Sequence, residues 1–296
     1  MGDSNSSKDL RDHIKFCISQ KDWEGSANAA INAISKFPKS LDFKKKLILS
    51  LDCLKKYDEA ISWADIAAKQ EIKLMKKSII PKENQIKSLE KHQRIMIAGY
   101  FYSGSGAIAD YLSGFPKTTK WTPYGEMRLI KTPGGLWDYK KNYLGKNNQE
   151  AILNLYLSII GEKQTNSIIW GKSNRSSRKI IADTNNAEYI ITLLKFWIKE
   201  KNKPSKNIKS FYKRSSKFIG EAYDKVCQIY DSERILVDQS INAFRLNLAK
   251  LIPPSTFIIV DRDPRDQFNE GKKAWKRLGI NKWQTAEEFI FDYKKT

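Results

Sequence analysis

Cysteine is scarce in this sequence, and the few cysteines lie far apart. The chain has 296 residues and three cysteines, Cys17, Cys53 and Cys227. Disulfide frameworks and zinc sites place cysteines in close, recurring pairs, so these spacings predict neither. We therefore expect a protein of a reducing, cytoplasmic environment that binds no metal.

Long apolar runs and a secretory leader are also missing. No run approaches the roughly 20 apolar residues that a membrane-spanning helix needs. The first residues, MGDSNSSKDLRDH, are polar and contain no apolar core behind a basic start. Hydrophobic residues make up 41% of the chain, as in ordinary globular proteins, and the length suits one large or two moderate domains. The sequence thus predicts no transmembrane segment.

Acidic residues are the minority charge. Lysine and arginine together number 53 against 33 aspartates and glutamates, which gives a formal charge of +20. Such an excess suits nucleic acid, an anionic membrane surface or polyanionic small ligands. The lysines are scattered through every segment, so lysine-rich codon usage is an alternative explanation. Because no helix-turn-helix, zinc-finger or RNA-binding motif occurs, we expect no specific nucleic-acid partner.

Residues 10–72 have a helical pattern that repeats at an offset of 34. The matching pairs are Lys21 with Lys55, Trp23 with Tyr57, Glu24 with Asp58, Ala30 with Ala64, and Ala33 with Ala67. Small residues at close helix contacts and an aromatic at a helix start, with this period, are typical of tetratricopeptide repeats. A helical bundle that matches by chance is the alternative. Because two repeats are few for a free-standing array, we expect them to pack against later segments of the chain.

These patterns also define the expected boundaries in the first third of the chain. Residues 1–9 are predicted to be a disordered lead, and residues 73–93 a linker. Between them we predict two helix pairs, which cover residues 10–20 with 23–36 and residues 42–54 with 57–71.

The stretch Arg94–Gly114, RIMIAGYFYSGSGAIADYLSG, combines a short apolar run with a turn rich in glycine and serine. Ile95–Ala98 is long enough for a buried strand, and residues 99–106 include three glycines and two serines. From Ala107, apolar residues recur at helical spacing. Strand, turn and helix in this order are how α/β proteins surround a phosphate with backbone N–H groups. No Gly-Lys-Ser/Thr follows, so this is no Walker A motif, and a plain tight turn is the alternative.

Two further apolar strands are expected in the last third, at residues 234–238 and 257–260. An amphipathic helix is predicted between them over residues 240–252, before Pro253-Pro254. The second strand continues directly into an Arg-Asp-Pro-Arg-Asp turn, residues 262–266. In a parallel sheet this turn and the Gly/Ser turn would both lie at the carboxyl edge of the strands, where such sheets bind ligands.

Helices and connections fill the middle of the chain. Helical patterns cover about 149–161, 186–201 and 216–231, while residues 130–148 and 199–214 have the composition of exposed connections. Strands that alternate with helices predict an α/β domain over residues 94–296, in which helices flank a P-loop-like parallel sheet.

Four short segments of this chain resemble segments of the sulfotransferases that use 3′-phosphoadenosine 5′-phosphosulfate (PAPS), and they occur in the same order along the chain. Ser103-Gly104-Ser105-Gly106 is similar to the family's 5′-phosphosulfate loop, and the turn 262–266 is similar to its 3′-phosphate motif. Residues 237–244, VDQSINAF, resemble its Asp-Lys-x-x-x-Asn-Phe segment. Tyr124–Arg128 resembles the segment that carries the catalytic carboxylate in tyrosylprotein sulfotransferases. With the helical repeats in front, the likeness is nearest to bacterial tetratricopeptide-repeat sulfotransferases and to the tyrosylprotein branch.

The resemblance implies a sulfotransferase fold, PAPS as the donor, and a hydroxyl of a glycan, peptide or small molecule as the acceptor. Glu126 would be the general base on that hydroxyl, and Arg128 would orient donor or acceptor. The residues implied to hold the donor are Tyr102, Ser103, Gly104, Ser105, Gly106, Ala107, Arg262 and Arg265. A protein partner on the helical repeats is a further expectation.

Several of these residues have a structural alternative. The two arginines could simply pair with the aspartates of their own turn. Glu126 could be an ordinary surface carboxylate, and Ser105 could only cap the helix after it.

The sequence also departs from the family pattern. Tyr102 stands where the family has Lys or Arg, and a tyrosine hydroxyl carries no positive charge at neutral pH. Gln239 replaces a lysine, and Glu270 replaces a serine that contacts the 3′-phosphate. The chain ends about 30 residues after the phosphate motif, where family members continue, which suggests a truncated or divergent member. A degenerate protein that holds PAP (the desulfated cofactor) or a protein partner without turnover is therefore the alternative function.

Overall fold

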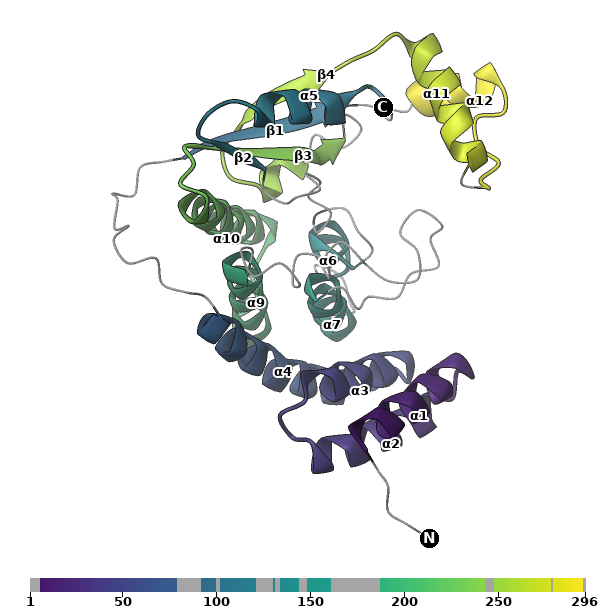
Figure 1. Ribbon diagram of the computed structural model, residues 1–296, viewed down its shortest axis with the longest axis vertical. Coiled ribbons are helices and arrows are strands. Elements are labelled where there is room, and N and C mark those ends of the chain that lie inside the picture. The colour runs from purple at the N-terminus through teal and green to yellow at the C-terminus, as the bar shows by residue number, and fades with distance from the viewer. Residues whose placement is uncertain are drawn as a thin grey trace. The chain divides into compact units, whose positions relative to one another are not determined.

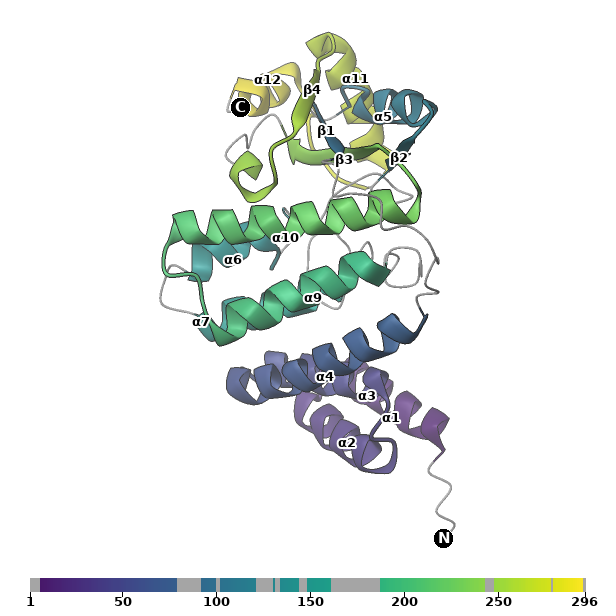
Figure 2. The ribbon, with the colours of Figure 1, turned by 90° about the vertical axis from the view of Figure 1, so that its left-hand side faces the viewer.

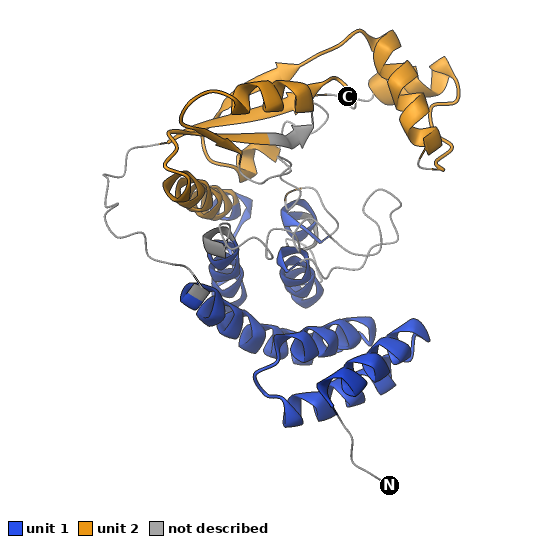
Figure 3. Ribbon diagram, viewed as in Figure 1, with its two compact units in different colours: residues 1–81, 131–211 blue, residues 82–130, 212–296 orange. Residues whose placement is uncertain are grey.

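The computed structural model describes residues 6–78, 92–99, 102–120, 130, 134–143, 148–160, 187–242, 248–277 and 279–294. Contacts within the chain define two compact units (Figure 3). Unit 1 comprises Met1–Pro81 with Lys131–Phe211, and unit 2 comprises Lys82–Ile130 with Tyr212–Thr296. The segment 94–296, which the sequence analysis treats as one domain, is thus shared between the two units.

Unit 1 is helical throughout its described residues. Its helices are α1 (Ser7–Ser19), α2 (Trp23–Lys36), α3 (Leu41–Cys53), α4 (Tyr57–Ser78), α6 (Leu136–Tyr143), α7 (Asn148–Ile159) and α9 (Ala187–Asn202) (Figure 1). None of the helices described in either unit is both long and apolar enough to cross a bilayer.

The 34-residue repeat is present in the backbone as well as in the sequence. Lys21 and Lys55 both adopt left-handed conformations, with φ of 60° and 59°. In both turns the next amide closes the helix end: the N–H of Asp22 donates to the Cys17 carbonyl and that of Lys56 to the Leu51 carbonyl, each at 2.9 Å. The four paired alanines, Ala30, Ala33, Ala64 and Ala67, are all 0% exposed. Their small side chains let adjacent helices approach closely, as the repeat predicts.

The helical array packs against later helices of the same unit, as expected for so short an array. Helix α4 contacts both α7 and α9. The Lys201 ammonium of α9 lies 2.6 Å from the Asp65 carboxylate of α4. The Trp197 indole N–H of α9 donates to the Ile152 carbonyl of α7 at 2.8 Å. Helices from residues 148–202 thus extend the stack that residues 7–78 begin.

Several expected boundaries in unit 1 are wrong. Helix α1 begins at Ser7, inside the expected disordered lead, because Ser6 and Asp9 cap it reciprocally. Helix α4 continues to Ser78, into the expected linker. The expected connection over residues 130–148 contains α6, whose Leu136 and Tyr139 are each 1% exposed. Burial against α7 outweighs the weak local helix preference of that stretch.

Unit 2 is built on a parallel sheet with helices beside it. The described strands are β1 (Gln93–Gly99), β2 (Thr118–Lys120), β3 (Arg234–Asn242) and β4 (Thr256–Val260), in the order β2-β3-β1-β4 (Figure 2). The helices are α5 (Ser105–Ser113), most of α10 (Ile208–Ile229), α11 (Pro264–Arg277) and α12 (Ala286–Lys294). Each strand pair is parallel, so the predicted α/β class with an all-parallel sheet is confirmed.

Strand β1 occupies the centre of this sheet. Its run Met96–Ala98 is at most 1% exposed, because α5 lies on one face of the sheet and α10 on the other (Figures 1 and 2). Arg94 is the buried charge of the strand. Its guanidinium Nη2 lies 2.8 and 2.9 Å from the two carboxylate oxygens of Asp224 on α10. This pair joins α10 to the amino end of the central strand.

Two expectations for unit 2 are corrected. The helix predicted over 240–252 is wrong, because β3 continues to Asn242, where it pairs with Gly99 of β1. Among the described residues of that stretch, 248–251 form a short 3₁₀ turn, with Leu248 and Leu251 fully buried. The expected connection over 199–214 is mostly helix, since α9 reaches Asn202 and α10 begins at Ile208. Strand pairing and core packing overrode the local sequence pattern in both places.

Candidate functional site

The Gly/Ser turn and the Arg-Asp-Pro-Arg-Asp turn meet at one edge of the sheet. Strands β1 and β4 are adjacent and parallel, with Gly99 opposite Val260 at their carboxyl ends. The two turns therefore leave the sheet side by side, as the sequence predicts.

Arg262 joins the two turns directly. Its Nη1 donates to the backbone carbonyl of Tyr102 at 3.5 Å, although the residues are 160 positions apart. The Arg262 Nε lies 3.6 Å from an Asp266 carboxylate oxygen, and 39% of its side chain is exposed. The guanidinium thus stands at the rim of the Gly/Ser turn with donors still open to solvent, where it could also bind an anion.

The amino end of α5 has no side-chain cap. Gly104 is the N-cap residue with φ of 92°, a conformation that favours glycine, and no side chain accepts from the first turn. The N–H groups of Ser105 and Gly106 precede the first intrahelical bonds, and they are what a helix offers to an anion. The N–H of Ala107, implied to bind the donor, instead donates to the Gly104 carbonyl at 3.0 Å. Ser105 is buried and does not act as the N-cap, so that alternative is wrong.

Ser103 contributes an unpaired hydroxyl to the same turn. It is 6% exposed, and its Oγ has no hydrogen-bond partner among the described residues. Buried hydroxyls are nearly always paired, because an unpaired one costs about 1–3 kcal/mol. An orphan hydroxyl next to an uncapped helix end fits a site whose ligand supplies the missing acceptor.

Gly99 makes room for this hydroxyl. A Cβ at Gly99 would lie 2.2 Å from Ser103 Oγ and 3.1 Å from the Val260 carbonyl. We expect Gly99→Ala to destabilise unit 2 by about 1–3 kcal/mol, because the serine must move away from the end of β1. Urea denaturation measures this effect. Gly114→Ala, at the other end of α5, is the control, and equal effects of the two substitutions would contradict the expectation.

Tyr102 anchors the turn to α11 and to the connection between α11 and α12. Its φ is 60°, in the left-handed region that non-glycine residues rarely adopt. Its ring lies edge-on to Trp275 and Trp283, with centroids 6.3 Å from each. A Cβ at Gly271 would come within 3.2 Å of the ring. Burial raises the pKa of the Tyr102 hydroxyl, while Arg277 opposes that change, so the side chain stays neutral at pH 7.

Arg265 forms an ion pair within its own turn. Its guanidinium Nη2 lies 2.6 Å from Asp263 Oδ2, its Nε lies 3.0 Å from Oδ1, and its side chain is 88% exposed. Hydrogen bonds from Arg265 lower the pKa of Asp263 to about 2. The expected alternative, arginines paired with the aspartates of their own turn, therefore describes the geometry of Arg265, and it also describes the Arg262 Nε beside Asp266. Its role toward a ligand stays a prediction.

Gln267 is a supporting residue that the sequence analysis missed. It is 1% exposed on the otherwise exposed first turns of α11, and its Nε2 donates to the Arg262 carbonyl at 2.8 Å. This bond fixes the backbone from which the Arg262 side chain extends. A buried glutamine inside a polar segment has no pattern that identifies it, because its burial depends on the fold.

No family model, curated protein or solved structure matches the chain.

The structure does not describe the predicted catalytic residues. Glu126 and Arg128 fall within residues 121–129, outside the described residues, and the side chain of Gln239 is also not described. Among the residues that the structure describes, no group of three or more His, Cys, Asp or Glu could hold a metal ion.

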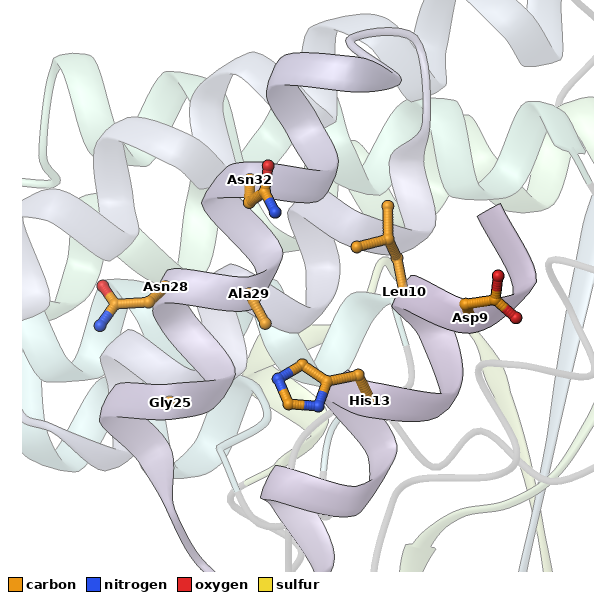
Figure 4. Close-up of a pocket in the computed structure, with 7 residues that line it drawn as sticks. All are labelled: Asp9, Leu10, His13, Gly25, Asn28, Ala29 and Asn32. Atoms are coloured by element: carbon orange, nitrogen blue, oxygen red, sulfur yellow. The ribbon is translucent and has the colours of Figure 1, made fainter. Parts of the chain in front are cut away.

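A separate hollow lies between α1 and α2 of unit 1 (Figure 4). It is lined by Asp9, Leu10, His13, Gly25, Asn28, Ala29 and Asn32. At the 34-residue offset, Leu10 and His13 correspond to Lys44 and Leu47 of α3, which are 3% and 0% exposed where α3 packs on α2. The corresponding positions of the first repeat line this hollow instead, although Leu10 is itself only 5% exposed.

Proposed function

We propose that the carboxyl edge of unit 2 binds PAPS and that the chain transfers its sulfuryl group to a hydroxyl of a glycan, peptide or small molecule. The observation that carries the proposal is the contact of Arg262 with the Tyr102 carbonyl, which places a guanidinium beside an uncapped helix end. An uncapped helix end, an orphan serine hydroxyl and a guanidinium together fit a ligand with two anionic groups.

Each residue has a defined task in this proposal. The N–H groups of Ser105 and Gly106, with the Ser103 hydroxyl, hold the 5′-side anion, while Arg262 holds the anion on the ribose. PAPS supplies a sulfuryl group on a phosphate leaving group. Negative charge grows on that phosphate as its bond to sulfur breaks, and the α5 amino end is oriented to stabilise it. Glu126 takes the acceptor proton as the new oxygen–sulfur bond forms, and Arg128 orients the reactants.

A second candidate function, nucleotide binding without turnover, is favoured by Tyr102. At the position where the resemblance implies a cation, the structure has a neutral ring packed between Trp275 and Trp283. No positive charge from that position reaches the leaving oxygen. Normal binding of PAP without sulfate transfer to any member of a broad panel of hydroxyl acceptors would establish this function instead.

A thermal-shift titration with PAP tests the proposed site. We expect the melting temperature of the wild type to rise, since a ligand at 100 times its Kd adds about 2.7 kcal/mol to the stability of the native state. Arg262→Ala should remove most of the rise, and Ser103→Ala should reduce it.

Arg234→Ala is the matched control for this titration. Arg234 is the first residue of β3, so it lies at the amino ends of the strands, away from the proposed site. Its Nη1 donates to the Pro116 carbonyl at 3.2 Å. It should lose the same charge and keep the response to PAP. No response in the wild type at low salt, or equal losses in the two arginine variants, would refute the proposed site.

A further inference from the structure

Helix α11 carries a row of charged residues, first two acidic and then two basic, that begins beside Arg262. Asp266, Glu270, Lys273 and Arg277 follow at spacings of four, three and four residues, so they share one face of the helix. Asp266 lies 3.6 Å from the Arg262 Nε. One turn further on, the Glu270 carboxylate lies 3.0 Å from the Lys273 ammonium.

Glu270 is the acidic residue of this row on which several basic side chains act. The pKa of its carboxyl is lowered mainly by the hydrogen bond from Lys273 and further by the charges of Arg262 and Arg277. Glu270 is therefore ionised at neutral pH, and it lies one helical turn beyond Asp266, the carboxylate next to Arg262. Its side chain is 42% exposed, so ligands and water can reach it.

This carboxylate changes what the Arg262 guanidinium can hold. A phosphate bound there is attracted by the guanidinium but repelled by Glu270 and Asp266. A ribose hydroxyl meets no such repulsion, because it can donate a hydrogen bond to a carboxylate. Glu270 also forms an ion pair with Lys273, so the Lys273 ammonium is less available to bind a phosphate.

We propose that Glu270 is a specificity-determining residue of the Arg262 site: it lowers the affinity for nucleotides phosphorylated on the ribose and spares those with free ribose hydroxyls. The inference rests on the proposed function, since it assumes that a nucleotide places its ribose near Arg262. Beyond the proposed function, the inference predicts that the two nucleotide classes bind with similar affinities. It also predicts that the Glu270 carboxylate is what keeps the difference in affinity small.

Calorimetric titration with two probes, PAP and adenosine 5′-monophosphate (AMP), tests this inference at low salt. The wild type should bind PAP less than about tenfold more tightly than AMP. In Glu270→Gln, PAP should bind about tenfold more tightly than in the wild type, while the affinity for AMP should change less than twofold. Glu270→Ser should act in the same direction, and circular dichroism checks that both variants are folded.

Glu221→Gln is the matched control, because it removes the same charge far along α10. Glu221 forms a comparable exposed pair, 3.8 Å from Lys217. It should leave the ratio of the two affinities unchanged. Binding of both probes with the same ratio in wild type and Glu270→Gln would overturn the inference alone. If neither probe binds the wild type or either variant, the proposed function fails, and the inference fails with it.

Discussion

Replacing Trp283 by alanine is expected to lower the stability of the α11–α12 region by about 3–5 kcal/mol. The indole is 3% exposed, and its ring centroid lies 5.0 Å from Phe289 and 6.0 Å from Trp275. Its Nε1 donates to an Asp292 carboxylate oxygen at 2.9 Å. The substitution would remove both the buried indole and this hydrogen bond.

The substitution of Trp283 should also weaken the packing that holds the Gly/Ser turn. Tyr102 packs on Trp283, so the turn loses part of its anchor and the thermal response to PAP should also decrease. Hydrogen exchange of the α11 and α12 amides measures the stability locally. Phe291→Ala is the control, since Phe291 lies on α12 and is 60% exposed. An effect of Trp283→Ala no larger than that of the control would contradict the assigned role of the cluster.

Arg94→Met should destabilise the sheet of unit 2 by about 3 kcal/mol, at the low end of the range for a broken buried ion pair. Arg94 is 8% exposed, whereas the Asp224 side chain keeps 27% of its surface exposed, which moderates the cost. Methionine keeps the length of the side chain but leaves the carboxylate without its guanidinium. Hydrogen exchange of the β1 and β3 amides measures the loss.

A double-mutant cycle separates this electrostatic effect from lost packing. The variant Arg94→Met/Asp224→Leu replaces both charges by apolar groups, and such replacements are often nearly neutral. We expect the double variant to be more stable than Arg94→Met alone, with a coupling energy above about 1 kcal/mol. Additive effects of the two substitutions would show that the ion pair contributes little.

Local patterns in the sequence predicted several elements. The apolar run at 95–98 became β1, because a parallel strand buried on both faces needs a continuous apolar run. The run at 257–260 became β4, although Phe257 and Ile259 of that strand are 39% and 62% exposed. Trp23 and Tyr57 begin α2 and α4 at the 34-residue offset, as the repeat predicts. These features depend on neighbouring residues or on a fixed period, so one sequence reveals them.

Other features were hidden from such patterns. Helix α6 lies in a stretch rich in lysine and asparagine, and its helical state depends on burying Leu136 and Tyr139. In the sequence, Tyr102 stands where the related family has a cation, whereas in the fold its ring packs against Trp275 and Trp283, more than 170 positions away. Gln267 was overlooked, since only the folded turn shows that it supports Arg262.

The sequence by itself determined the alternation of strands and helices, the helical repeat, and the two turns that belong at the carboxyl edge of a parallel sheet. Only the tertiary structure decided that Arg262 reaches the Tyr102 carbonyl and that the Ser103 hydroxyl is left without a partner among the described residues. The reason is physical. Strand and turn preferences act between neighbouring residues, whereas a binding site is set by contacts between side chains that folding brings together across more than a hundred residues.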